Sequence, residues 1–90
     1  MILAVMAIHQ QTGELAAGPD LIARGFMSAD GSEEVMERAK KVVLDTLGAS
    51  SRETRTDPGE LQEQVRVALR RYFRKTIERR PVVVALIMET

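Results

Sequence analysis

Two short apolar segments near the two ends of the chain have the length and the residue types of β-strands. They read ILAVMAI over residues 2–8 and VVVALIM over residues 82–88, with no charged residue in either. A short apolar run rich in β-branched residues is typical of a strand that is covered on both sides. We therefore predict one strand over Ile2–Ile8 and another over Val82–Met88.

The segment after the first strand combines turn residues with a second extended stretch. Gly13 lies within Gln11–Glu14, and its tolerance of positive φ predicts a turn there. A strand that resumes near Leu15 would complete a hairpin. Gly18-Pro19-Asp20 interrupts this strand, and Leu21–Ser28 is extended again. That last stretch is either a continuation beyond a β-bulge or a separate edge strand.

The first of two helices is expected at about Glu33–Leu47. Ser32 suits the N-cap position, and Gly48 suits the C′ position just beyond the helix. Apolar residues recur at helical spacing between these two signals. The apolar face consists of Val35, Met36, Ala39, Val42, Val43 and Leu47.

The second helix is expected at about Pro58–Ile77, after a polar segment at Ala49–Thr56 that we predict to be a mobile loop. Asp57, Pro58 and Glu60 form a strong helix start, with Asp57 at the N-cap and Glu60 at N3. The buried face is predicted to contain Leu61, Val65, Ala68, Leu69, Tyr72 and Thr76, with Phe73 and Ile77 at its edge.

These elements predict an α+β fold, a two-layer α/β arrangement with the element order ββααβ. We expect a small three-stranded sheet with both helices on one face and a single domain over residues 1–90, because a chain this short builds only one modest core. No apolar run approaches the roughly 20 residues needed to cross a bilayer, so no membrane partner is expected. Met1–Ile8 lacks a basic leader and a small-residue cleavage site and is not interpreted as a signal peptide.

The predicted strands at Ile2–Ile8 and Val82–Met88 are apolar on both of their faces. Two helices, however, can cover only one face of a small sheet. Leaving a large aliphatic side chain in water forgoes about 1.5–3 kcal/mol. We therefore predict that the second face packs against another copy of the chain or against a larger protein. The alternative is an unexpected helix placement that covers the strands within this chain. The residues assigned to the assembly interface are Val82, Val84, Leu86, Met88, Met6 and Ile8.

The residue types needed for catalysis or metal binding are sparse. The chain has no cysteine and one histidine, His9, which we interpret as a surface or hairpin residue at the end of the first strand. One histidine without cysteine cannot form the common zinc sites. There is no glycine-rich phosphate loop and no acidic spacing typical of a metal cage. We expect no catalytic residue, no metal ligand and no cofactor site in this chain.

Basic residues are concentrated in one segment, although the 13 basic and 13 acidic residues of the chain balance. Arg66–Arg80 contains one acidic residue, Glu78, among its bases. The helix surface that carries these bases is either simply solvated, or it contacts the phosphates of an RNA backbone or an acidic partner. Three aromatic residues are too few for a base-stacking platform. The candidate contact residues are Arg66, Arg70, Arg74, Lys75, Arg79 and Arg80.

Several short motifs occur in an order that resembles the C-terminal domain of ribonuclease J. They are Gly18-Pro19-Asp20, Arg24-Gly25-Phe26, Lys75, Arg79-Arg80-Pro81 and Met88-Glu89. The ordered set covers essentially the whole chain, although no single motif is specific. Ala23 departs from the family, which often has serine before Arg-Gly-Phe.

The resemblance implies a function that composition alone does not indicate. Ribonucleases J are cytoplasmic, metal-dependent hydrolases that degrade RNA from 5′ to 3′, and some also cut internally, in RNA processing and decay. Their two divalent metal ions, zinc or manganese, sit in a metallo-β-lactamase domain whose histidine-rich motifs are missing here, so the resemblance assigns no catalytic residue to this chain.

For this chain, the resemblance implies a role in homodimer or tetramer assembly and in supporting the catalytic domains of the parent enzyme. An accessory module that contacts the RNA backbone through the second helix is the alternative. A third hypothesis, a regulatory domain that binds a metabolite, has no supporting motif.

Overall fold

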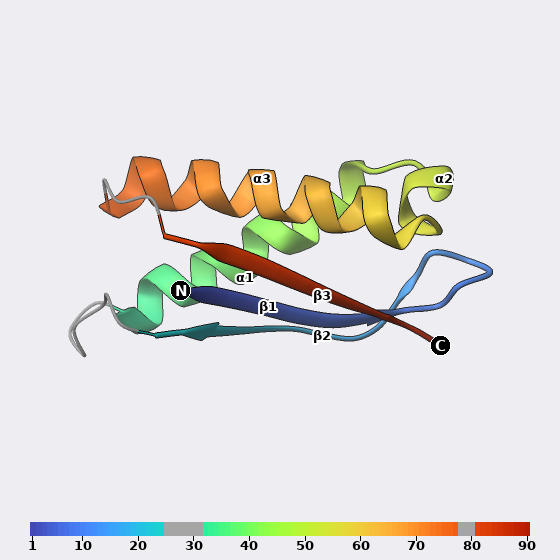
Figure 1. The fold of residues 1–90 in the computed structure, drawn as a ribbon, viewed down its shortest axis with the longest axis horizontal. Coiled ribbons are helices and arrows are strands. Elements are labelled where there is room, and N and C mark those ends of the chain that lie inside the picture. The colour runs from blue at the N-terminus through green and yellow to red at the C-terminus, as the bar shows by residue number, and fades with distance from the viewer. Residues whose placement is uncertain (25–31, 78–80) are drawn as a thin grey trace.

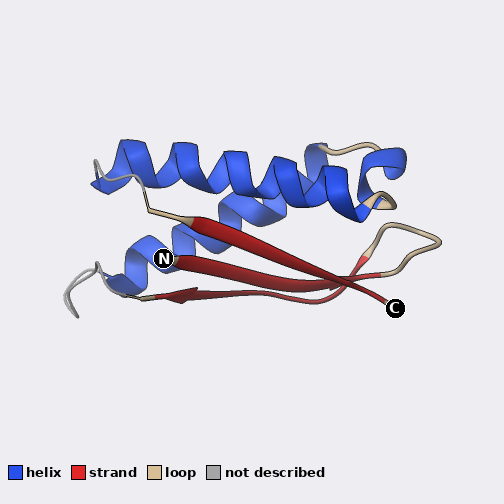
Figure 2. Ribbon diagram, viewed as in Figure 1, coloured by secondary structure: helices blue, strands red, loops and turns tan. Residues whose placement is uncertain are grey.

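Three strands form one sheet, and the two long helices lie on the same side of it (Figures 1 and 2). This computed structural model describes residues 1–24, 32–77 and 81–90. The elements are β1 (Ile2–Ile8), β2 (Leu15–Ala23), α1 (Ser32–Ala49), α2 (Arg52–Arg55), α3 (Pro58–Ile77) and β3 (Val83–Glu89). The predicted α+β fold and its ββααβ order are confirmed, with the short helix α2 added between the two long ones.

Strand β1 is the central strand of the sheet, whose order is β2-β1-β3. It pairs antiparallel with β2, to which residues 9–14 connect it, and parallel with β3. A parallel pair needs a long crossover connection, and the helices supply it. The two pairings place Val5 opposite both Asp20 of β2 and Leu86 of β3.

The hydrophobic core lies between the sheet and the two long helices. Alternate residues of β1 and β3 point into it, as expected for a strand with one covered face. The fully buried aliphatic side chains each contribute about 1.5–3 kcal/mol relative to exposure. The core residues are Ile2, Ala4, Met6, Ile8, Ala39, Val43, Leu47, Leu61, Val65, Leu69, Phe73, Val83 and Ala85.

Strand β2 continues through the Gly18-Pro19-Asp20 motif, which confirms the bulged continuation rather than a separate strand. The β1–β2 register shifts between Val5 and Ala7, and Gly18 has φ +87° beside a cis Gly18–Pro19 bond. A Cβ at Gly18 would lie 2.8 Å from the carbonyl oxygen of Val5, so only glycine fits there. Gly13 adopts φ +75° in the predicted turn. Residues 25–28 of the expected extension lie outside the described residues.

The segment between the long helices is more ordered than the sequence predicted. Helix α1 runs through Gly48 to Ala49, so the prediction of Gly48 as the C′ residue was wrong. The predicted loop contains α2, whose N-cap Ser51 accepts a hydrogen bond from the Thr54 backbone nitrogen at 3.2 Å. The polar side chains that suggested a loop satisfy the local backbone instead. Arg52 then fixes α2 to the β1–β2 turn, because its Nη2 donates to the Gln11 carbonyl at 2.8 Å.

Helix α3 begins as predicted. The Asp57 side chain accepts a hydrogen bond from the Glu60 backbone nitrogen at 3.3 Å, which caps the helix. Its buried face differs from the prediction, because Phe73 is completely buried and Thr76 is exposed. Side chains spaced four residues apart form one of the main packing ridges of a helix, and the buried residues of α3 follow such a ridge. The buried residues are Leu61, Val65, Leu69 and Phe73.

Candidate contact surfaces

The sheet face opposite the helices is apolar and partly exposed. Ile22, Leu86 and Met88 are 46%, 47% and 53% exposed, and the neighbouring apolar side chains are half-buried. We call this surface the open face, and it consists of Leu3, Val5, Ile22, Val84, Leu86 and Met88. Its residues come from all three strands, so the open face is contiguous across the sheet. The described part of the chain places no helix over it.

Two residues assigned to the interface from the sequence lie on the other face of the sheet. Met6 and Ile8 are each 1% exposed and belong to the core under the helices. The parallel pairing places Leu3 beside Val84 and Val5 beside Leu86, so Leu3 and Val5 belong to the open face. Both faces of β1 are apolar, so the sequence alone did not reveal which residues of β1 lie on the same side of the sheet as Val84 and Leu86.

Val82 lies just before β3 and not in the strand itself. Its side chain is 67% exposed, and its carbonyl accepts a hydrogen bond from the Ile2 nitrogen at 2.8 Å. The sequence analysis also missed Ile22 of β2. The alternation of Asp20, Ile22 and Arg24 was the signal available for it, because alternate residues of a strand share one face.

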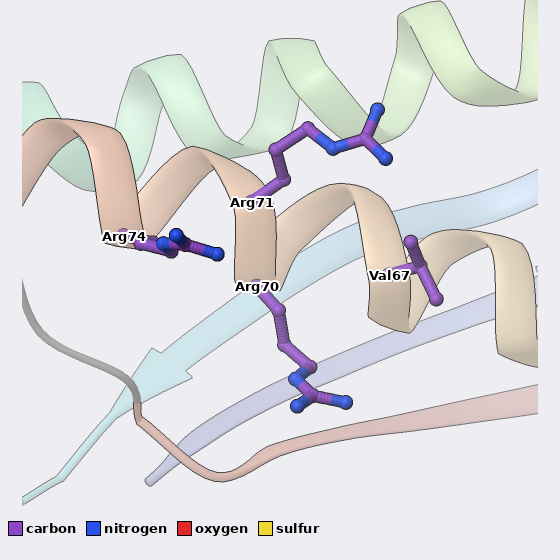
Figure 3. A pocket seen from close by; sticks show the side chains of 4 residues that line it. All are labelled: Val67, Arg70, Arg71 and Arg74. Carbon is purple, nitrogen blue, oxygen red and sulfur yellow. The ribbon is translucent and has the colours of Figure 1, made fainter.

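The outer surface of α3 carries three arginines around a shallow depression of about 230 Å³, which Val67 also lines (Figure 3). We call Arg70, Arg71 and Arg74 the basic face. In this view the Arg70 and Arg71 side chains extend away from each other. All three arginines are exposed, and none forms an ion pair with another residue in the described ranges. They therefore concentrate positive charge on one exposed helix surface.

The other predicted basic residues differ from these three. Arg66 is paired with Glu63, with Nη2 2.6 Å from Oε1, so its charge is already compensated. Lys75 is exposed near the end of α3. Arg79 and Arg80 lie outside the described residues. The structure thus brings Arg70 and Arg74 together with Arg71, which was not among the predicted contact residues.

His9 follows β1 at the end of the molecule where the chain terminates. Its Nδ1 lies 3.1 Å from the Thr90 hydroxyl, and both residues are exposed. Within residues 1–24, 32–77 and 81–90, no three His, Cys, Asp or Glu side chains lie close enough together to hold a metal ion. None of the helices described here is long and apolar enough to span a membrane.

Comparison with known proteins identifies the family. The model of the ribonuclease J C-terminal domain matches residues 1–90. The chain is 26% identical over 89 residues to "Ribonuclease J 2" of Staphylococcus aureus (strain NCTC 8325 / PS 47) and 25% identical over 89 residues to "Ribonuclease J2" of Bacillus subtilis (strain 168). Each match covers 99% of this chain but 16% of the relative. Because the family model covers the whole chain, this chain belongs to the ribonuclease J C-terminal domain family.

Proposed function

We propose that this chain is the assembly domain of a ribonuclease J and that its open face is buried when copies of the enzyme associate. The open face is the observation that carries this proposal. Contiguous apolar surface is uncommon on a monomer and marks interaction sites. Here it covers all three strands, and Leu86 and Met88 are about half exposed. Burying such side chains against a second apolar surface supplies the free energy of association.

The hydrolysis of RNA would belong to the remainder of the parent protein. The chain spans 16% of the length of the curated relatives that it matches. The residues described here bring together no set of side chains suited to hold the two zinc or manganese ions that the family resemblance implies. We therefore assign metal binding, and the 5′-to-3′ and internal cleavage that depends on it, to other domains of a cytoplasmic enzyme.

Self-association of the chain tests the proposal. Light scattering at increasing concentration is expected to give masses above the 10.0 kDa of the monomer. Leu86→Asp is expected to prevent association through the open face, because that contact would bury an unpaired carboxylate. A monomeric mass for the unchanged chain at millimolar concentration would contradict the proposal.

Leu44→Asp is the matched control. Leu44 and Leu86 are both 47% exposed, but Leu44 lies on α1 rather than on the sheet. The two variants therefore place the same charge at equally exposed leucines. Equal loss of association in both variants would assign the effect to surface charge in general and not to the open face. Circular dichroism checks that both variants fold.

A second candidate function, contact with the RNA backbone, is favoured by the basic face. Arg70, Arg71 and Arg74 are exposed, and the described residues offer them no carboxylate partner. Guanidinium groups bind phosphate oxygens through two parallel hydrogen bonds. The relatives are called ribonucleases, and RNA presents such phosphates along its whole length. Contact at this face would act together with assembly, since it uses a different surface.

A further inference from the structure

The charges along the edge strand β2 are complementary to those of a second β2 strand that runs in the opposite direction. Asp20, Ile22 and Arg24 alternate along one face, opposite Val5, Leu3 and Met1 of the neighbouring chain segment. The acid lies two residues before the isoleucine and the base two residues after it. Both charged residues are exposed, and neither side chain has an ion pair or hydrogen bond within the described ranges. About 13 Å separates them along the strand, too far for mutual pairing.

The backbone of β2 is also unpaired on its outer side. Met1 and Arg24 exchange two hydrogen bonds: the Met1 nitrogen donates to the Arg24 carbonyl at 2.7 Å, and the Arg24 nitrogen donates to the Met1 carbonyl at 2.9 Å. Such pairs alternate in an antiparallel ladder, so the backbone groups of Ile22 also point towards β1. Those of Leu21 and Ala23 point away from it. Strand β2 is at the edge of the sheet, and Figure 1 places no described element beyond it.

We propose that two copies of this chain pair antiparallel through the outer edges of β2, with Ile22 opposite Ile22 of the second copy. Asp20 then faces Arg24 of the second copy, and the twofold axis repeats this ion pair. Leu21 and Ala23 exchange backbone hydrogen bonds across the new ladder. Opposite charges directly across two strands stabilise the pairing. This inference rests on the proposed assembly function and adds a second contact, at the edge of the sheet, to the open face.

Neighbouring registers are less favourable. A shift of the pairing by two residues in one direction places Pro19, which has no N–H, opposite Ala23 of the second copy, where a donor is needed. The same shift in the other direction places Ile22 opposite Arg24. Either shift also separates Asp20 from Arg24 of the second copy. Of these three registers, only the one centred on Ile22 places Asp20 opposite Arg24 and keeps Pro19 out of the pairs formed between residues 20 and 24.

The other edge of the sheet is less available. The Val82 carbonyl accepts from Ile2, so the Ala85 carbonyl points away from β1. The Gln62 side-chain amide of α3 donates to this carbonyl, which partly satisfies the β3 edge. Edge strands that are covered in this way resist further pairing. The β2 edge has no such side-chain cover among the described residues.

Pairing through β2 also agrees with burial of the open face. The twofold axis would be perpendicular to the joined sheet, so both open faces lie on the same side of a six-stranded sheet. The paired chains then present one continuous surface, in which the two open faces flank the Ile22 pair and the Asp20–Arg24 ion pairs. Two such dimers packed by this surface would form a tetramer, which satisfies both the edge and the open face.

Charge reversal tests the pairing. Asp20→Arg and Arg24→Asp should each weaken self-association about tenfold, because each turns two attractive pairs into two repulsive ones. The double variant Asp20→Arg/Arg24→Asp should restore it. A mixture of the two single variants should form heterodimers, measurable by light scattering with circular dichroism as the folding control. If the single variants associate as strongly as the unchanged chain, the pairing is overturned.

Disulfide trapping gives a second readout, since the chain contains no cysteine. Ile22 and its symmetry mate would form a non-hydrogen-bonded pair with Cα atoms about 4.5 Å apart, a separation that a disulfide can bridge. Ile22→Cys should cross-link on mild oxidation, whereas Leu44→Cys on α1 should not. Failure of Ile22→Cys to cross-link in an assembly that Leu86→Asp still dissociates would overturn the β2 pairing alone. A chain that is monomeric at every concentration would overturn the assembly function as well.

Discussion

At the scale of single residues, the glycines show how closely the backbone segments approach one another. Gly18 combines φ +87° with a site where a Cβ would lie 2.8 Å from the Val5 carbonyl oxygen. Gly48 lies inside α1, and a Cβ there would meet no atom within 4 Å. The same substitution therefore has opposite expected effects at the two sites.

Gly18→Ala should lower the free energy of unfolding by about 1–3 kcal/mol, because a non-glycine residue at positive φ is strained. Gly48→Ala should raise it by about 0.5–1 kcal/mol through improved helix propensity. Urea unfolding followed by circular dichroism measures both. A Gly18→Ala variant as stable as the unchanged chain would show that β2 can follow a different path at this point.

At the scale of elements, the sequence predicted the strands and long helices to within a few residues, because their signals are local. Asp57 and Pro58 begin α3 where the capping pattern indicated. No local signal indicated which faces β1 and β3 share in the sheet, because both strands are apolar on both sides. Met6 and Ile8 were therefore assigned to the wrong face of the sheet. Phe73 was predicted at the edge of the buried face of its helix, whereas its side chain is completely buried.

Asp57→Ala tests whether the cap of α3 contributes as its geometry indicates. Loss of the hydrogen bond to the Glu60 nitrogen should lower the free energy of unfolding by about 0.5–2 kcal/mol. Asp45→Ala is the control, because Asp45 is exposed within α1 and caps no helix. Chemical denaturation compares the two. Equal destabilisation by both substitutions would argue against a specific role of the cap.

At the scale of the whole molecule, the candidate surfaces lie on different sides of the fold. The open face lies on the sheet, the free β2 edge lies beside it, and the basic face lies on the outer surface of α3. The two-layer fold accounts for this separation, because the helices lie on one side of the sheet and the described residues leave its other side and the β2 edge uncovered. Assembly through the sheet would therefore leave the helix surface available for a second partner.

The basic face gives the last prediction. If Arg70, Arg71 and Arg74 contact phosphates, single-stranded RNA binding should weaken with salt, with a log–log slope near −2, because each contact contributes about −0.7. Arg70→Glu/Arg74→Glu should remove most of that slope. Arg38→Glu/Lys41→Glu on α1 changes the net charge equally and should leave the slope largely unchanged. The two long helices thus carry the same charge change at different places. Fluorescence anisotropy at several salt concentrations measures the slopes, and equal effects of both double variants would mean that RNA responds only to net charge.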